Sequence, residues 1–151
     1  MKHITKISLA VLISIGVIIL LYTYTTDSTK GPEIADESIT TPLPTSTVIN
    51  NEDLSGTSTA KQFSIPSGLD YVKVSFKNTG SKPFTFTINQ GSTTGTAKMS
   101  GTVPADGKEH AFFSNKAWPT GEFYVNTSSA QGMTGKLSVH LGNDINELNN
   151  L

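Results

Sequence analysis

The chain has 151 residues, a formal net charge of −1, eleven lysines, no arginine and no cysteine. The absence of cysteine excludes a disulfide framework, a thiolate metal site, a cysteine nucleophile and a lipidated-cysteine anchor. Without arginine the chain lacks the planar guanidinium that reads phosphates and bases bidentately, so we expect no nucleic-acid partner.

The first 24 residues consist of a basic head and an uncharged apolar segment. Residues 1–6 contain Lys2 and Lys6, and residues 7–24 contain no charged side chain. About eighteen helical residues rise roughly 27 Å, close to the hydrocarbon thickness of a bilayer. Because lysines precede the segment and acids dominate after it, we predict a cytoplasmic head, a transmembrane signal-anchor helix in the lipid bilayer at 7–24, and an extracytoplasmic remainder.

A cleaved signal peptide is the alternative interpretation of the same segment, and it would make the protein secreted. The apolar run is longer than the hydrophobic region of most signal peptides. It ends in Tyr-Thr-Tyr-Thr-Thr, which offers no pair of small residues for cleavage. These two features favour a single-pass protein retained in the cell membrane.

Residues 25–56 are rich in threonine, serine, proline, asparagine and acidic residues. A segment of this composition buries too little apolar surface to offset the entropy lost on ordering it. We therefore predict a flexible, polar, acidic tether. The alternative is that apolar residues between Ile34 and Ile49 form one short strand that joins the domain.

From residue 57 to residue 142 short runs alternate apolar with polar side chains and are separated by turn residues, a pattern typical of strands. The strands are expected at 61–65, 71–77, 84–89, 97–103, 109–114, 122–127 and 135–141. The second and third of them are expected to pair as a hairpin. Residues 143–151 form a polar tail, either frayed or a single helical turn.

The alternation predicts an all-β fold in which each strand has one packed face and one wet face. About seven short strands suit a small antiparallel two-layer sandwich of Greek-key or jelly-roll type. The predicted organisation is therefore one N-terminal transmembrane helix, a tether and a single β-sandwich domain.

Lys73 and Lys77 share one face of a predicted strand. The expected hairpin would place them beside Thr85 and Thr87, which gives a basic, hydroxyl-rich surface. Such a surface would suit an anionic envelope polymer or lipid headgroups. The alternative is an ordinary solvated face whose lysines protect a sheet edge.

Trp118 and Tyr124 are the candidates for a platform on which a glycan could stack. The alternative places Trp118, which precedes Pro119, in the core or at a corner of the fold.

Outside the N-terminal segment, the sequence contains few residues that could act in catalysis or bind a metal ion. His110 and His140 lie inside predicted strands, while Asp106 and Glu109 flank a turn, where solvated acids are ordinary. There is no Gly-x-Ser-x-Gly elbow and no calcium-binding loop of the Asp-x-Asp-x-Asp-Gly kind. We therefore expect no catalytic residue, no metal and no cofactor.

These observations predict a membrane-anchored, extracytoplasmic binding or interaction module of the cell envelope that is not an enzyme. One alternative is a small envelope hydrolase whose site brings His110 and an acid together in a cleft. Another is a structural or immunity-type partner of a different membrane protein. The oligomeric state stays open.

Overall fold

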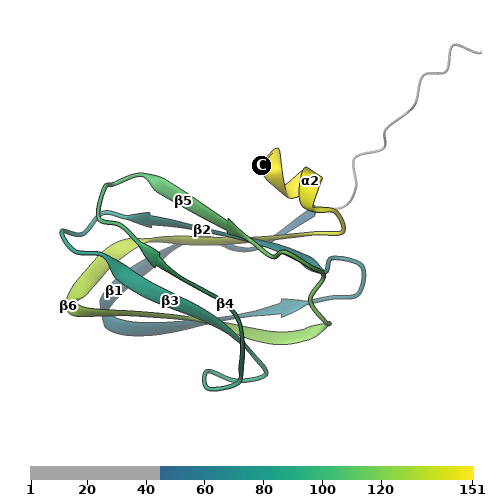
Figure 1. The fold of residues 1–151 in the computed structure, drawn as a ribbon, viewed down its shortest axis with the longest axis horizontal. Helices are drawn as coiled ribbons and strands as arrows, with labels where there is room; N and C mark the ends of the chain where they lie inside the picture. Colours follow the sequence, from purple (N-terminus) through teal and green to yellow (C-terminus); the bar gives the residue numbers. More distant parts are fainter. Residues whose placement is uncertain (1–44) are drawn as a thin grey trace, which may run out of the picture. The chain divides into compact units, whose positions relative to one another are not determined.

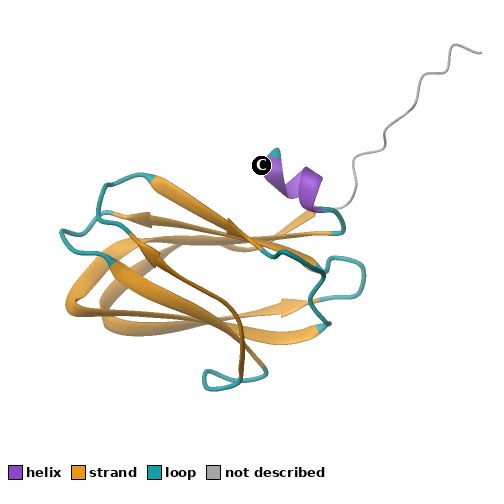
Figure 2. Ribbon diagram, viewed as in Figure 1, coloured by secondary structure: helices purple, strands orange, loops and turns teal. Residues whose placement is uncertain are grey.

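The computed structural model describes residues 45–151, so the predicted head, the predicted span at 7–24 and residues 25–44 lie outside the described residues. The described elements, shown in Figures 1 and 2, are β1 (Thr45–Ile65), β2 (Tyr71–Asn78), β3 (Phe84–Gln90), β4 (Thr96–Val103), β5 (Glu109–Phe113), β6 (Gly121–Gly142) and the short helix α2 (Ile145–Asn149). None of the helices in this part of the chain is long and apolar enough to cross a bilayer.

β1 starts earlier than the sequence analysis predicts. It pairs antiparallel with β6 from Thr45 opposite Gly142 to Ile65 opposite Gly121. The predicted boundary between tether and domain at residue 56 is therefore wrong, because residues 45–56 are strand. Within them only Ile49 and Leu54 are buried, and at a sheet edge two buried residues leave too little alternation to mark a strand.

β1 and β6 bend together at a corner. Four residues of β6, 129–132, lie opposite the single residue Thr57 of β1. Gly56 and Gly132 have φ of 85° and 81°, values that glycine adopts without the strain a Cβ would cause. The predicted strands 122–127 and 135–141 are thus the two halves of one bent strand.

The bend folds one continuous sheet, with strand order β4-β3-β6-β2-β5 and β1 alongside β6, into two layers (Figure 1). The first layer contains β4, β3, residues 121–128 of β6 and residues 58–65 of β1. The second layer contains β5, β2, residues 135–142 of β6 and residues 45–56 of β1. The all-β antiparallel prediction is confirmed in this sandwich-like form, while its Greek-key or jelly-roll type stays a prediction.

The predicted hairpin of β2 and β3 is wrong. β2 pairs with β5 and β6, whereas β3 pairs with β4 and β6. The turn at 79–83 crosses between the layers instead, and the N–H groups of Thr79 and Gly80 both donate to the carbonyl of Thr134, at 2.8 and 3.0 Å. Asn78 is fully buried and its Nδ2 donates to the carbonyls of Lys82 and Val103. These bonds direct the chain away from β2.

The core lies between the layers and is rich in phenylalanine. The ring centroids of Phe76 and Phe86 are 4.6 Å apart, and those of Phe86 and Phe112 are 4.7 Å apart. Burial of such large apolar side chains is the main driving force for folding. The buried apolar cluster comprises Ile49, Leu54, Phe63, Ile65, Val72, Val74, Phe76, Phe84, Phe86, Ile88, Val103, Trp118, Phe123, Val125, Met133, Leu137, Val139 and Leu141.

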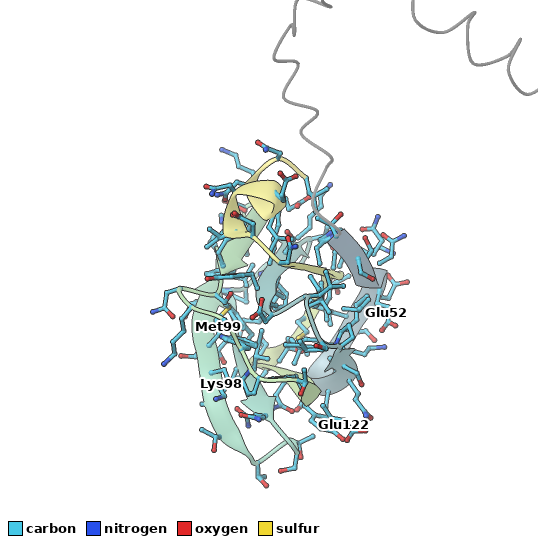
Figure 3. The ribbon with its side chains drawn as sticks, turned by 90° about the vertical axis from the view of Figure 1, so that its right-hand side faces the viewer. Glu52, Lys98, Met99 and Glu122 are labelled. Carbon is cyan, nitrogen blue, oxygen red and sulfur yellow. The ribbon has the colours of Figure 1, made fainter. Side chains whose placement is uncertain are left out.

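The two long edges of the sandwich differ. On one edge β1 belongs to both layers, and Lys61 and Glu52 form an ion pair of 2.7 Å between its two halves. The opposite edge is formed by β4 and β5, each of which pairs on one side only. Figure 3 shows Glu52 on the first edge, and Lys98 and Met99 of β4 on the other.

The helix α2 follows β6 and packs on the second layer. Asp144 caps it by accepting a hydrogen bond from the N–H of Asn146 at 2.7 Å. Leu148 is fully buried against Gly142, and Lys73 Nζ donates to the main-chain oxygen of Leu151 at 3.1 Å. The predicted polar tail therefore contains one helical turn that covers part of a sheet.

Candidate functional site

Twelve outward side chains of the first layer form a broad surface that we name the hydroxyl face, and Glu122 of β6 borders it. They alternate along their strands with buried residues such as Phe86 and Val125, so they point away from the core. Cross-strand register aligns them in three rows, namely Ser58, Ser128, Thr85 and Thr102; Ala60, Asn126, Thr87 and Ser100; and Gln62, Tyr124, Asn89 and Ala97.

None of these positions is charged. The face consists of hydroxyls, carboxamides, one phenol and two alanines. Neighbouring strands lie about 4.8 Å apart, so each row offers polar groups at short, regular intervals. Hydroxyls and carboxamides both donate and accept hydrogen bonds, so the surface can bind a ligand that carries many hydroxyl groups without demanding charge on it.

Two of the carboxamides are held by the loop at 91–95. Asn89 Nδ2 donates to the carbonyl of Thr93 at 2.6 Å, and Asn126 Nδ2 donates to the same oxygen at 3.0 Å. Asn89 is only 8% exposed, and its Oδ1 has no hydrogen-bond partner within residues 45–151. The loop thus fixes one end of the hydroxyl face, because a shared acceptor limits how either amide can turn.

Tyr124 is the aromatic residue of the hydroxyl face and is half-buried. Its Oη donates to Oε2 of Glu122 at 3.4 Å. Burial, together with the negative charge of Glu122, raises the pKa of the Tyr124 phenol. The side chain therefore stays neutral near pH 7 and offers an apolar ring together with a polar tip.

The structure separates the predicted lysines from the predicted threonines. Thr85 and Thr87 lie on the hydroxyl face, with Tyr124 in a neighbouring row. Lys73 and Lys77 belong to β2 in the second layer. The predicted basic, hydroxyl-rich surface does not form, because it depended on the hairpin of β2 and β3.

The outward side chains of the second layer form what we name the charged face. One row across its strands is Glu109, Lys77, Lys136 and Asp53. Lys136 Nζ lies 2.8 Å from Asp53 Oδ1, and Glu109 is directly opposite Lys77. Each lysine of the row has a carboxylate neighbour, so this face is not a basic patch.

Lys73 lies on the charged face but is only 7% exposed. Its ammonium lies 5.6 Å above the ring of Phe113 and donates to the main-chain oxygen of Leu151. A cation over an aromatic face is stabilised by the ring quadrupole. Lys73 therefore holds the segment that follows α2 and does not present a free charge to a ligand.

Trp118 and Tyr124 do not form the predicted platform. Trp118 is 3% exposed and stacks on Phe123, with ring centroids 5.2 Å apart. Phe123 faces the core, while Tyr124, its neighbour in β6, faces outward. The alternative that placed Trp118 in the core is confirmed, and Tyr124 alone remains on the surface.

Each histidine within residues 45–151 has one part of a hydrolytic triad. His110 Nε2 lies 2.9 and 3.0 Å from the two carboxylate oxygens of Asp106, and this contact, with the N–H of Lys108, lowers the pKa of Asp106. His140 Nδ1 lies 2.9 Å from Thr47 Oγ1. A triad needs one histidine between a hydroxyl and an acid, and neither contact supplies both. Among residues 45–151 no three histidines or acids gather as metal ligands.

Neither a protein family nor a curated protein matches this sequence. One similar solved structure is the pre-peptidase C-terminal domain of a collagenase from Bacillus anthracis, with 18% identity and a TM-score of 0.44; the match covers 59% of this chain and 88% of that one. A second is the CBM36-1 domain of a multidomain xylanase from the hindgut metagenome of Trinervitermes trinervoides, with 10% identity and a TM-score of 0.45, covering 66% of this chain and 97% of that one. A third is the disulfide-linked pilus formed by Bacillus endospore appendages, with 17% identity and a TM-score of 0.39, covering 68% of this chain and 94% of that one. The resemblance is one of β architecture, and no function is transferred from it.

Proposed function

We propose that this protein is a non-catalytic binding module that holds a neutral glycan on the hydroxyl face. The observation that carries the proposal is the three-row surface of hydroxyls and carboxamides that includes Tyr124, in which none of the twelve positions is charged and the Glu122 carboxylate lies at the border. In the proposed arrangement residues 7–24 anchor the chain in the cell membrane and the domain lies outside it.

Glycan chemistry fits this surface in two ways. Sugar hydroxyls need partners that both donate and accept, which the serine, threonine and asparagine side chains supply. The carbon-bound face of a sugar ring is apolar, and the ring of Tyr124 offers an apolar surface with a polar tip beside it. The charged face serves an anionic polymer less well, because Lys77 and Lys136 there lie beside Glu109 and Asp53.

The test is calorimetric titration of the purified full chain with a panel of neutral hexasaccharides built from glucose, mannose, xylose or N-acetylglucosamine. We expect one member to bind. Tyr124→Ala should weaken that binding about tenfold through loss of the stacking surface. Thr87→Lys should abolish it, because a long charged side chain would stand at the centre of the hydroxyl face.

The matched control is Ala111→Lys, which adds the same side chain to β5, where Ala111 is exposed on the charged face opposite Ser75. This variant should bind the glycan as the unaltered chain does. If all members of the panel fail to bind, or if Ala111→Lys and Thr87→Lys weaken binding equally, the hydroxyl face is not the site.

The proposed topology has its own test. Protease added to intact cells should remove the domain while leaving residues 1–24 protected, and the mass of the protein before digestion should equal that of the uncleaved chain. A mature mass that lacks the first 24 or so residues would instead support secretion after cleavage.

A further inference from the structure

A pocket of about 240 Å³ opens beside the corner of the sandwich. It is lined by Lys82, Pro83, Ser129, Ala130 and Gln131. The first two belong to the turn between β2 and β3, and the other three belong to the extra residues that β6 inserts at its bend. The pocket therefore exists because the crossing turn and the corner meet.

The walls of this pocket are fixed by hydrogen bonds. Asn78 is fully buried, donates to the carbonyl of Lys82 at 2.9 Å and accepts from the N–H of Gly80 at 3.0 Å. Ser129, itself 7% exposed, donates from Oγ to the carbonyl of Pro83 at 3.4 Å and so joins the two walls. A preformed pocket costs less ordering on binding than one that the ligand must assemble.

The pocket is continuous with the hydroxyl face. Ser129 directly follows Ser128, and Pro83 lies two residues before Thr85. Ser128 and Thr85 are neighbours in the first row of the face, and Thr85 Oγ1 donates to the carbonyl of Ser128 at 3.4 Å. The pocket therefore borders the first row of the hydroxyl face, through the backbone next to Ser128 and Thr85.

The chemistry of the lining differs from that of the face in one respect, which is a positive charge. Lys82 takes part in none of the ion pairs formed within residues 45–151, whereas Lys61 and Lys136 are each paired with a carboxylate. No acidic residue lines the pocket. Gln131 adds an amide donor, while the Ser129 hydroxyl is used in its bond to Pro83, and Pro83 and Ala130 add an apolar wall.

From this arrangement we infer that the pocket binds an anionic group, a carboxylate or a phosphate, carried by a sugar residue of the glycan. The inference rests on the proposed function and adds a substrate preference to it. The neutral face would bind the chain, and Lys82 would favour chains that carry an acidic substituent near the corner. A charge-assisted hydrogen bond from an ammonium to such an anion is stronger than one between neutral groups.

The test uses each hexasaccharide of the panel in three forms: unmodified, with one residue replaced by a uronic acid that carries a carboxylate, and phosphorylated at one hydroxyl. We expect at least one acidic form to bind about fivefold more tightly than the neutral form at low salt. The preference should shrink as salt rises, because screening weakens ion pairs near the surface. Comparison of the two acidic forms identifies which anion the pocket prefers.

Lys82→Gln should lower the affinity for the acidic form to that for the neutral form. Lys116→Gln removes the same charge from the exposed loop between β5 and β6, and it should retain the preference. If the neutral and acidic forms bind equally, the inference about the pocket fails while the proposed function stands. If no form binds, both fail. If Lys116→Gln abolishes the preference as fully as Lys82→Gln, the effect is one of net charge and the pocket is not the site.

Discussion

The hydroxyl face and the charged face share the strands β1 and β6, yet their chemistry is opposite. Before the corner β6 presents Tyr124, Asn126 and Ser128 outward, and after it the outward residues include Lys136 and His140. The first set is uncharged and its cross-strand neighbours are uncharged, with the Glu122 carboxylate at the border beside Tyr124. The second set forms contacts within the protein, because Lys136 pairs with Asp53 and His140 with Thr47.

Under the proposed function, one layer binds the ligand and the other completes the fold. On the charged face α2 places Leu148 against Gly142, and Lys73 holds the main-chain oxygen of Leu151. On the hydroxyl face the row of Ser58, Ser128, Thr85 and Thr102 is exposed throughout. Substitutions on the charged face should therefore affect stability, and those on the hydroxyl face should affect binding.

The largest expected effect is the loss of stability when the side chain of Leu148 is shortened. Leu148 is fully buried between α2 and the second layer. Leu148→Ala should lower the free energy of unfolding by about 2–4 kcal/mol, since it removes buried methyl groups and leaves a cavity. Denaturant unfolding followed by the fluorescence of Trp118 measures this, because Trp118 is buried in the core.

Tyr124→Ala is the matched change on the hydroxyl face and should cost less than about 1 kcal/mol of stability. If Tyr124→Ala proves as destabilising as Leu148→Ala, the hydroxyl face has a structural role comparable to that of the charged face. The division between the two faces would then be wrong.

A smaller change in stability should follow a change in pH, through His140 on the charged face. Burial first, and then the nearby Lys73 ammonium, lower the pKa of His140 below 6.5, while Glu109 opposes the shift. The unfolded chain therefore takes up a proton on His140 more readily than the folded protein. The contribution of neutral His140 to the free energy of unfolding is fully present above pH 6.5. It is lost as the pH falls from 6.5 toward the lowered pKa of His140.

Thermal unfolding from about pH 7.5 to about pH 5.5 measures this dependence, because the window contains the ordinary pKa of histidine. The midpoint should fall with pH in the unaltered chain and fall less in His140→Gln. Lys73→Met should also reduce the fall, because it removes the neighbouring positive charge. An equal fall in all three proteins would assign the pH dependence to other groups.

The strands themselves were largely predictable from the sequence, whereas their partners were not. Alternation located β2 through β5 within a few residues, because burial on one side imposes a period of two. The same pattern says nothing about which strands pair. Five residues connect β2 to β3, a length that suits either a hairpin or a crossing between layers. Here the chain crosses between layers because Asn78 donates to the carbonyl of Val103 and the turn donates to the carbonyl of Thr134. Both carbonyls belong to residues that are distant in sequence.

The site was predictable only in part. Thr85, Thr87 and Tyr124 were named from the sequence and do share one face. The sequence offered no sign that Ser58 and Ser128 would complete that face, because strand register alone aligns them and both lie outside the strands predicted at 61–65 and 122–127. A search for uncharged outward positions on every predicted strand would have found Thr85, Thr87 and Gln62, but it would have missed Ser58 and Ala60 of β1.

The smallest expected effect is a difference in stability between two serine variants on the charged face. The two serines, Ser75 of β2 and Ser138 of β6, are cross-strand neighbours. Ser138 Oγ accepts a hydrogen bond from the N–H of Asn51 at 3.0 Å, whereas Ser75 is 4% exposed and its Oγ has no partner within residues 45–151. Removing an acceptor that satisfies a backbone donor costs stability, while removing an unsatisfied buried hydroxyl does not. Ser138→Ala should therefore lower the free energy of unfolding by about 0.5–1.5 kcal/mol, and Ser75→Ala should leave it unchanged or raise it slightly. Denaturant unfolding of the two single variants measures both effects, and a larger loss for Ser75→Ala than for Ser138→Ala would show that the hydroxyl of Ser75 makes a stabilising hydrogen bond.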